Sequence, residues 1–65
     1  MRVIVNGEVR EVGDETLFAL VEASGANPAH AAAALNGELV PLARWPETPL
    51  KENDEVEILV FVGGG

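Results

Sequence analysis

The last residues of the sequence are the ones whose types most directly suggest chemistry. An apolar stretch, residues 60–62, leads into Gly63, Gly64 and Gly65, where the sequence ends on a main-chain carboxylate. A glycine run gives up backbone entropy when it is ordered and adds no side chain to a core. The tail is therefore either dispensable or the part of the protein that does its work.

The other polar side chains offer little that could catalyse a reaction. The sequence has no cysteine, which excludes disulfides, a thiolate nucleophile and a thiolate metal site. Ser24 and His30 lack a third group that would orient them as a catalytic pair, and we expect His30 to be an exposed loop residue. Glu52, Asp54 and Glu55 lack the spacing of a calcium loop, so we interpret them as a solvated turn. We predict no catalytic residue and no metal ligand.

The length of the chain also argues against an autonomous enzyme. A single domain of 65 residues buries only about 60% of the surface that its unfolded chain exposes. An enclosed ligand pocket of roughly 300–1,000 Å³ would take up much of so small a core. We therefore expect a binding or carrier protein that holds no cofactor of its own.

The charge of the chain narrows the class of partner. Eleven acidic and four basic residues give a formal net charge of −7, which repels nucleic acid and anionic membranes. The acidity either serves solubility alone or also steers the chain toward a basic groove on another protein. The sequence has neither the roughly 20-residue apolar stretch of a membrane span nor the pattern of a signal peptide. We expect a soluble, cytoplasmic protein without a nucleic-acid or membrane partner.

Two Asn-Gly pairs organise the elements that must position the tail. The pair at residues 6–7 predicts a hairpin of strands 1–5 and 8–12, and the pair at residues 36–37 predicts a second hairpin. In that second hairpin, strand 32–35 is alanine-rich and has the intrinsic propensity of a helix, yet the turn favours a strand. Between the hairpins, a helix is predicted from Leu17 to Gly25.

The end of the sequence predicts one more strand, residues 55–62, after an irregular crossing that Trp45 anchors. The first and last strands can lie parallel at the centre of the sheet. The inner face of the sheet, which covers the helix, is then formed by Val3, Val5, Val56, Ile58 and Val60. Ile4, Leu59 and Phe61 emerge on the opposite face, where we predict a partner-binding surface. The predicted fold class is α+β, a mixed sheet of four to five strands packed on one short helix.

Several segments are informative in their order and spacing: Asn6 with Gly7, residues 35–41 (LNGELVP), Trp45, residues 50–58 (LKENDEVEI) and the closing Gly-Gly-Gly. Together they resemble the ThiS family, the sulfur carriers of thiamin-thiazole biosynthesis. The resemblance covers essentially the whole chain and implies a ubiquitin-like β-grasp domain over residues 1–62 with a tail of residues 63–65. The sequence departs from the family pattern at Leu42, where a basic residue is expected, and at Asn53, where a turn glycine is expected; asparagine tolerates the same left-handed conformation.

The resemblance also implies a role for the tail. In proteins similar to this one, a ThiF-like activating enzyme adenylates the terminal carboxylate with ATP and Mg²⁺. Sulfur from a persulfide donor then gives a thiocarboxylate that serves a ThiG-like thiazole synthase. Gly65 would carry the sulfur, Gly63 and Gly64 would be recognised as bare backbone, and the chain would be a co-substrate rather than an enzyme. Two alternatives share this fold and tail: the MoaD-like small subunit of molybdopterin synthase, and a ubiquitin-like protein modifier.

Overall fold

Two hairpins with Asn-Gly turns form the two sides of the sheet. The computed structural model describes residues 1–61, and in it β1 (Arg2–Val5) pairs antiparallel with β2 (Glu8–Glu11), as β3 (Ala31–Leu35) does with β4 (Glu38–Val40). Asn6 and Asn36 have φ values of 50° and 51°, and the glycines that follow have φ values of 83° and 88°. Positive φ at both central residues matches the twist of a two-residue hairpin. The strand prediction for the alanine-rich segment is confirmed, because the turn and the sheet override its helix propensity.

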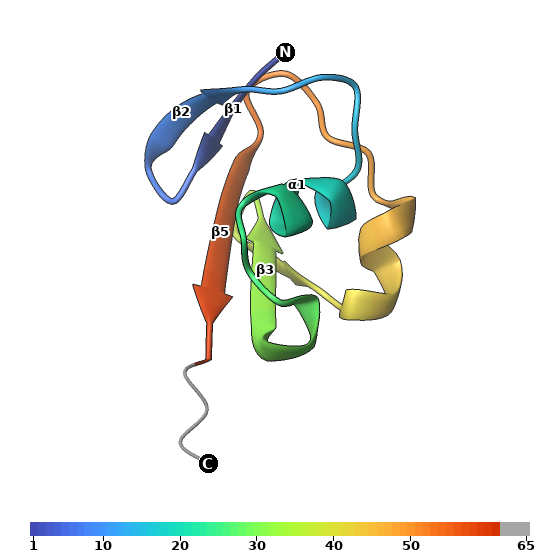
Figure 1. Ribbon diagram of the computed structural model, residues 1–65. Helices are drawn as coiled ribbons and strands as arrows, with labels where there is room; N and C mark the ends of the chain where they lie inside the picture. The colour runs from blue at the N-terminus through green and yellow to red at the C-terminus, as the bar shows by residue number, and fades with distance from the viewer. Residues whose placement is uncertain (62–65) are drawn as a thin grey trace.

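The last strand, β5 (Glu55–Val60), lies at the centre of the sheet. The strand order is β2-β1-β5-β3-β4, with β5 parallel to β1 and antiparallel to β3 (Figure 1). The predicted central pair of first and last strands is therefore confirmed. The result is a mixed five-stranded sheet of the β-grasp type.

One short helix covers one face of this sheet. In α1 (Leu17–Ala23), the side chain of Thr16 accepts a hydrogen bond from the backbone N–H of Ala19 at 3.2 Å and so caps the first turn. Gly25, at a φ of 89°, takes the left-handed conformation that ends the helix. The buried residues of α1 are Leu17, Leu20 and Val21, which lie three and four residues apart and therefore share one face of the helix.

Two short 3₁₀ helices fill the connections. They are η1 (Pro28–His30) and η2 (Leu42–Glu47). The second stands where the sequence predicts an irregular crossing, and it places Trp45 in the core with 1% of its surface exposed. The Trp45 indole Nε1 donates a hydrogen bond to the carbonyl of Val40 at 2.8 Å, so Trp45 anchors the crossing to the β3–β4 hairpin as predicted.

Val60 corrects the predicted inner face. Val3, Val5, Val56 and Ile58 are buried against α1, but Val60 is 54% exposed although it lies on the same face. A helix of seven residues spans about 10 Å, whereas a strand of six residues spans about 20 Å. The helix is therefore too short to cover the side chain of Val60 at the end of β5.

Asp54 corrects the interpretation of a solvated turn. Only 8% of Asp54 is exposed; its carboxylate accepts hydrogen bonds from Asn36 Nδ2 at 3.0 Å and from the backbone N–H of Lys51 at 2.8 Å. Asn53 has a φ of 69°, the conformation for which a glycine would otherwise be used. The turn before β5 is therefore fastened to the β3–β4 hairpin through a buried carboxylate, while Glu52 and Glu55 are exposed as predicted.

Candidate functional site

The described part of β5 leads directly to the glycine tail. The predicted tail residues Gly63, Gly64 and Gly65 lie outside the described residues, as does residue 62. Phe61, the last described residue, donates its backbone N–H to the carbonyl of His30 at 2.8 Å. Four residues follow Phe61, and an extended chain of that length spans about 13 Å. Gly65 therefore lies within that distance of Phe61.

The three residues of the predicted partner surface do not form one row. Leu59 and Phe61 are 62% and 58% exposed, whereas Ile4 is half-buried. In the parallel pairing of β1 with β5, Ile4 is the cross-strand partner of Glu55. Alternation along β5 places Glu57 between Glu55 and Leu59 on the same face. Two carboxylates therefore separate Ile4 from Leu59. Ile4 instead has Val9 of β2 as its cross-strand neighbour.

The structure brings other apolar residues beside Leu59 that the sequence reasoning did not include. Leu59 pairs with Ala32 and Ala34 pairs with Leu39, which is 75% exposed. Small alanines between two leucines leave a shallow depression of about 240 Å³, with Glu57 at its rim. We call this surface the outer patch; it consists of Ala32, Ala34, Leu39 and Leu59. The Asn-Gly turn fixes the register of β3 against β4, but the register of β3 against β5, which brings Leu59 beside Ala32, has no such local signal.

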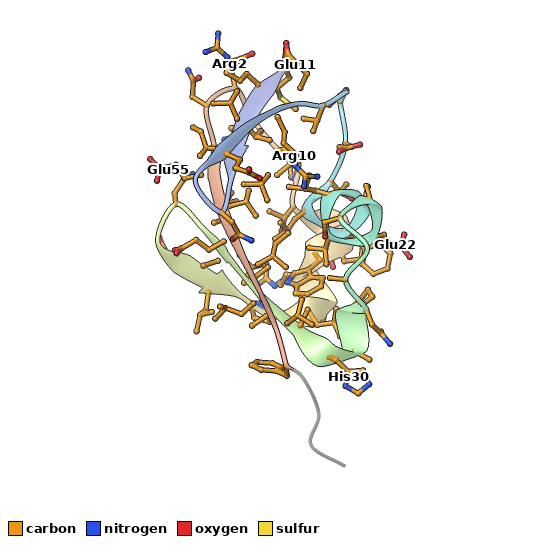
Figure 2. All side chains as sticks on the ribbon, turned by 60° about the vertical axis from the view of Figure 1, so that its left-hand side comes forward. Arg2, Arg10, Glu11, Glu22, His30 and Glu55 are labelled. Atoms are coloured by element: carbon orange, nitrogen blue, oxygen red, sulfur yellow. The ribbon has the colours of Figure 1, made fainter. Side chains whose placement is uncertain are left out.

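A second concave surface lies on the helix side of the sheet, beside the end of β5. This open groove of about 680 Å³ runs between the β1–β2 hairpin and the segment after α1. Ile58 and Val60 form part of its lining, together with the charged Glu8 and Arg10. Figure 2 shows Arg10 on the helix side of its hairpin and His30 near the end of the described chain.

Two polar side chains of this groove, Ser24 and Asn27, have structural hydrogen bonds. Ser24 Oγ donates to the carbonyl of Val21 at 2.6 Å at the end of α1, and Asn27 caps η1 by accepting from the N–H of Ala29 at 3.0 Å. His30 is exposed, as predicted for a loop residue. Within residues 1–61 no group of three or more histidine or acidic side chains is placed to hold a metal ion.

Comparison with known proteins identifies the family. A family model described as the ThiS family matches residues 3–65, nearly the whole chain. The chain belongs to the ThiS family. The predicted resemblance to this family is therefore confirmed.

Two solved structures support both the family and its ubiquitin-like β-grasp fold. The crystal structure of the thiamine biosynthesis protein ThiS from Geobacter metallireducens superposes with a TM-score of 0.83 at 32% sequence identity. The alignment covers all of this chain and all of that protein. A solution structure of a thiamine biosynthesis protein from the same organism gives a TM-score of 0.80 at 32% identity, covering all of this chain and 88% of the other.

A curated relative is a larger protein. A thiazole synthase from Paramagnetospirillum magneticum is 32% identical over 66 residues. The match covers all of this chain, but the chain spans only 20% of the length of that relative.

Among the described residues no helix has the length and apolar character needed to cross a membrane.

Proposed function

We propose that the carboxylate of Gly65 carries sulfur for thiamin-thiazole synthesis as a thiocarboxylate, formed through an adenylate. The observation that carries the proposal is the ThiS family match, which extends through the glycine run to residue 65. The composition supports it, because a chain without cysteine has no thiol on which to hold sulfur. The main-chain carboxylate is then the group that remains for the task.

The chemistry begins with activation, because a free carboxylate is a poor electrophile. An oxygen of the Gly65 carboxylate attacks the α-phosphorus of ATP in a ThiF-like enzyme, where Mg²⁺ binds the phosphates, and pyrophosphate leaves. A persulfide sulfur then attacks the acyl carbon, and AMP leaves. A thiol then attacks the sulfur that is farther from the acyl carbon and still bonded to the donor. The S–S bond breaks, a disulfide forms between the thiol and the donor, and the thiocarboxylate is released. The thiol supplies the two electrons of that last step.

The glycines make this activation sterically feasible. Gly63 and Gly64 present backbone alone, so a partner can enclose the chain in a channel too narrow for side chains. An extended segment of residues 62–65 spans about 13 Å, which is long enough for the carboxylate to enter a site on the partner while the β-grasp domain stays outside. The chain therefore acts as a co-substrate, and its partner supplies the catalytic groups.

We assign the docking surface for the activating enzyme to the outer patch together with Phe61. Leu59 and Phe61 are exposed within a few residues of the tail, and an apolar surface rimmed by carboxylates such as Glu57 suits a partner with an apolar centre and basic edge. A thiazole synthase is the proposed acceptor of the sulfur. The similarity of this chain to one fifth of a thiazole synthase supports that partner.

The proposal is tested by reconstitution with defined enzymes. Incubation with a ThiF-like enzyme, ATP and a persulfide donor should exchange one terminal oxygen for sulfur, seen by mass spectrometry. The isolated thiocarboxylate should then donate its sulfur to a thiazole synthase, and a chain lacking Gly65 should do neither. Transfer only to a molybdopterin synthase large subunit, or isopeptide linkage of Gly65 to lysines, would overturn the proposal in favour of a MoaD-like subunit or a protein modifier.

A further inference from the structure

The backbone hydrogen bonds of β5 alternate strictly between its two neighbours. The N–H of Phe61 donates to the carbonyl of His30, and the carbonyl of Glu55 accepts from the N–H of Asn36 at 2.7 Å. The backbone N–H and C=O groups of the odd-numbered residues of β5 therefore point toward β3. Those of the even-numbered residues point toward β1. On that side Ile4 donates to the carbonyl of Asp54 at 2.8 Å.

β1 ends before β5 does, and one side chain continues its hydrogen bonding. The chain turns away from β5 at Asn6, whose backbone N–H donates to the carbonyl of Val56 at 2.9 Å. The Asn6 side chain then takes both bonds of the next even-numbered residue: Ile58 N–H donates to Oδ1 at 2.8 Å, and Nδ2 donates to the Ile58 carbonyl at 3.3 Å. An asparagine side chain is thus in the place of one further peptide unit of β1.

Val60 is the next residue on this side of β5. Alternation directs its N–H and C=O away from β3, and no residue among 1–61 hydrogen-bonds to either group. Figure 1 shows the second half of β5 with β3 on one side and no strand of the described chain on the other. Beyond the end of β1, the central strand β5 therefore has one side without a neighbouring strand among the described residues, and the backbone groups of Val60 lie on that open edge.

The open groove borders this edge. Val5, Ile58 and Val60 give it an apolar floor, and Glu8 and Arg10 of the edge strand lie along its side. A strand placed beside β5 at Val60 would direct alternate side chains to this face. The groove has room for an apolar side chain at that position.

The length of the tail indicates what covers the edge, an argument that rests on the proposed function. Gly65 lies at most about 13 Å beyond Phe61, so the enzyme that holds the Gly65 carboxylate must approach Val60 closely. An N–H and a C=O that lose water without gaining a partner are each costly. The surface that covers Val60 must therefore supply an acceptor and a donor at the spacing of a β-strand.

We infer that an extended backbone segment of the adenylating enzyme adds to the sheet at Val60, in the position that β1 would occupy if it continued past Asn6. The segment accepts a hydrogen bond from the Val60 N–H and donates one to the Val60 C=O, and an apolar side chain of the segment enters the groove. Strand addition of this kind recognises main chain rather than side chains. It aligns the last residues of β5, and hence the tail, with the enzyme.

Amide hydrogen exchange of the isotope-labelled chain, followed by NMR, tests the inference directly. In the free protein the amide of Val60 should exchange rapidly, whereas the amides of Leu59 and Phe61 should be protected by β3. In the complex with the adenylating enzyme, the Val60 amide should become at least tenfold slower to exchange. A complex that forms pyrophosphate from ATP while the Val60 amide exchanges as in the free protein would overturn the inference and leave the proposed function intact. Absence of both the complex and adenylation would overturn both.

A pair of variants provides the second test. Val60→Pro removes the N–H that faces the enzyme and breaks no hydrogen bond to β3, while Val60→Ala shortens the side chain and keeps the N–H. Loss of one hydrogen bond should make Val60→Pro bind the enzyme roughly three- to tenfold more weakly than Val60→Ala. The protection of the Leu59 and Phe61 amides in free Val60→Pro reports whether the strand is intact. Equal affinity of the two variants with that protection preserved would contradict the inference.

Discussion

At the scale of single residues, Asn6 has two structural roles that a substitution series can separate. Its φ of 50° shapes the hairpin turn, and its side chain hydrogen-bonds to the backbone of Ile58 on the adjacent strand β5. Asn6→Gly keeps the left-handed conformation and loses the two side-chain bonds, so it should lower the free energy of unfolding by about 1–2 kcal/mol. Asn6→Ala should lose about a further 1 kcal/mol because it disfavours positive φ. Urea denaturation measures both; an Asn6→Gly variant as stable as the parent would show that water replaces the bonds to Ile58 without loss.

Phe61 is the exposed residue nearest the tail among those described, and its role can be tested against a matched surface site. Phe61→Asp should weaken binding to the activating enzyme by on the order of 2 kcal/mol, the range of an interface anchor, with little change in stability because Phe61 is 58% exposed. Val9→Asp is the control: Val9 is 62% exposed on the edge strand β2, away from the outer patch. Calorimetric titration should separate the two variants. Similar losses for both would indicate that added charge, rather than the position of Phe61, weakens binding.

At the scale of elements, η2 depends on a single side chain for its attachment to the sheet. Trp45 is buried and its indole N–H bonds to the Val40 carbonyl. Trp45→Phe keeps an aromatic ring and leaves that carbonyl without its donor, so the free energy of unfolding should fall by about 1–3 kcal/mol. Trp45→Ala removes the whole indole ring, and a cost of about 3–5 kcal/mol should leave so small a domain largely unfolded. Thermal unfolding followed by far-UV circular dichroism measures this ranking; a Trp45→Ala variant that melts like Trp45→Phe would show that the crossing packs without its anchor.

The elements also show which features the sequence could predict. Turn chemistry is local, so the two Asn-Gly pairs predict both hairpins, and the order of the elements allows the first and last strands to pair at the centre of the sheet. Coverage by a helix is not local: Val60 lies on the predicted face but is exposed because α1 stops short of it. Asp54 is buried because the hairpin turn at Asn36 approaches it, a contact between segments that no period in the sequence reveals. The sequence did not predict the outer patch for the same reason, since its residues come together only through the register of β3, β4 and β5.

At the scale of the whole molecule, the β-grasp domain and the tail should be separable. The described fold hydrogen-bonds as far as Phe61, and Gly64 and Gly65 have no side chains to pack. Deleting both should change the thermal midpoint by less than about 2 °C, since roughly 1 kcal/mol is needed to shift a domain of this size by about 4–8 °C. The same deletion should abolish ATP–pyrophosphate exchange by the activating enzyme. A large loss of stability in the shortened chain would mean that the last glycines are part of the fold.

The net charge of the whole chain should govern the rate at which it meets its partner. With a formal charge of −7, association with a basic surface should slow as salt is raised, while dissociation changes much less.

Two double variants show which carboxylates cause this effect. Each variant loses two carboxylates, so its net charge changes from −7 to −5. Glu55→Gln with Glu57→Gln removes carboxylates beside the outer patch, and Asp14→Asn with Glu22→Gln removes exposed carboxylates elsewhere. Stopped-flow association should show the greater loss of rate and of salt dependence for the first pair. Equal effects would assign the steering to total charge, and salt-independent association of the parent chain would remove electrostatic steering altogether.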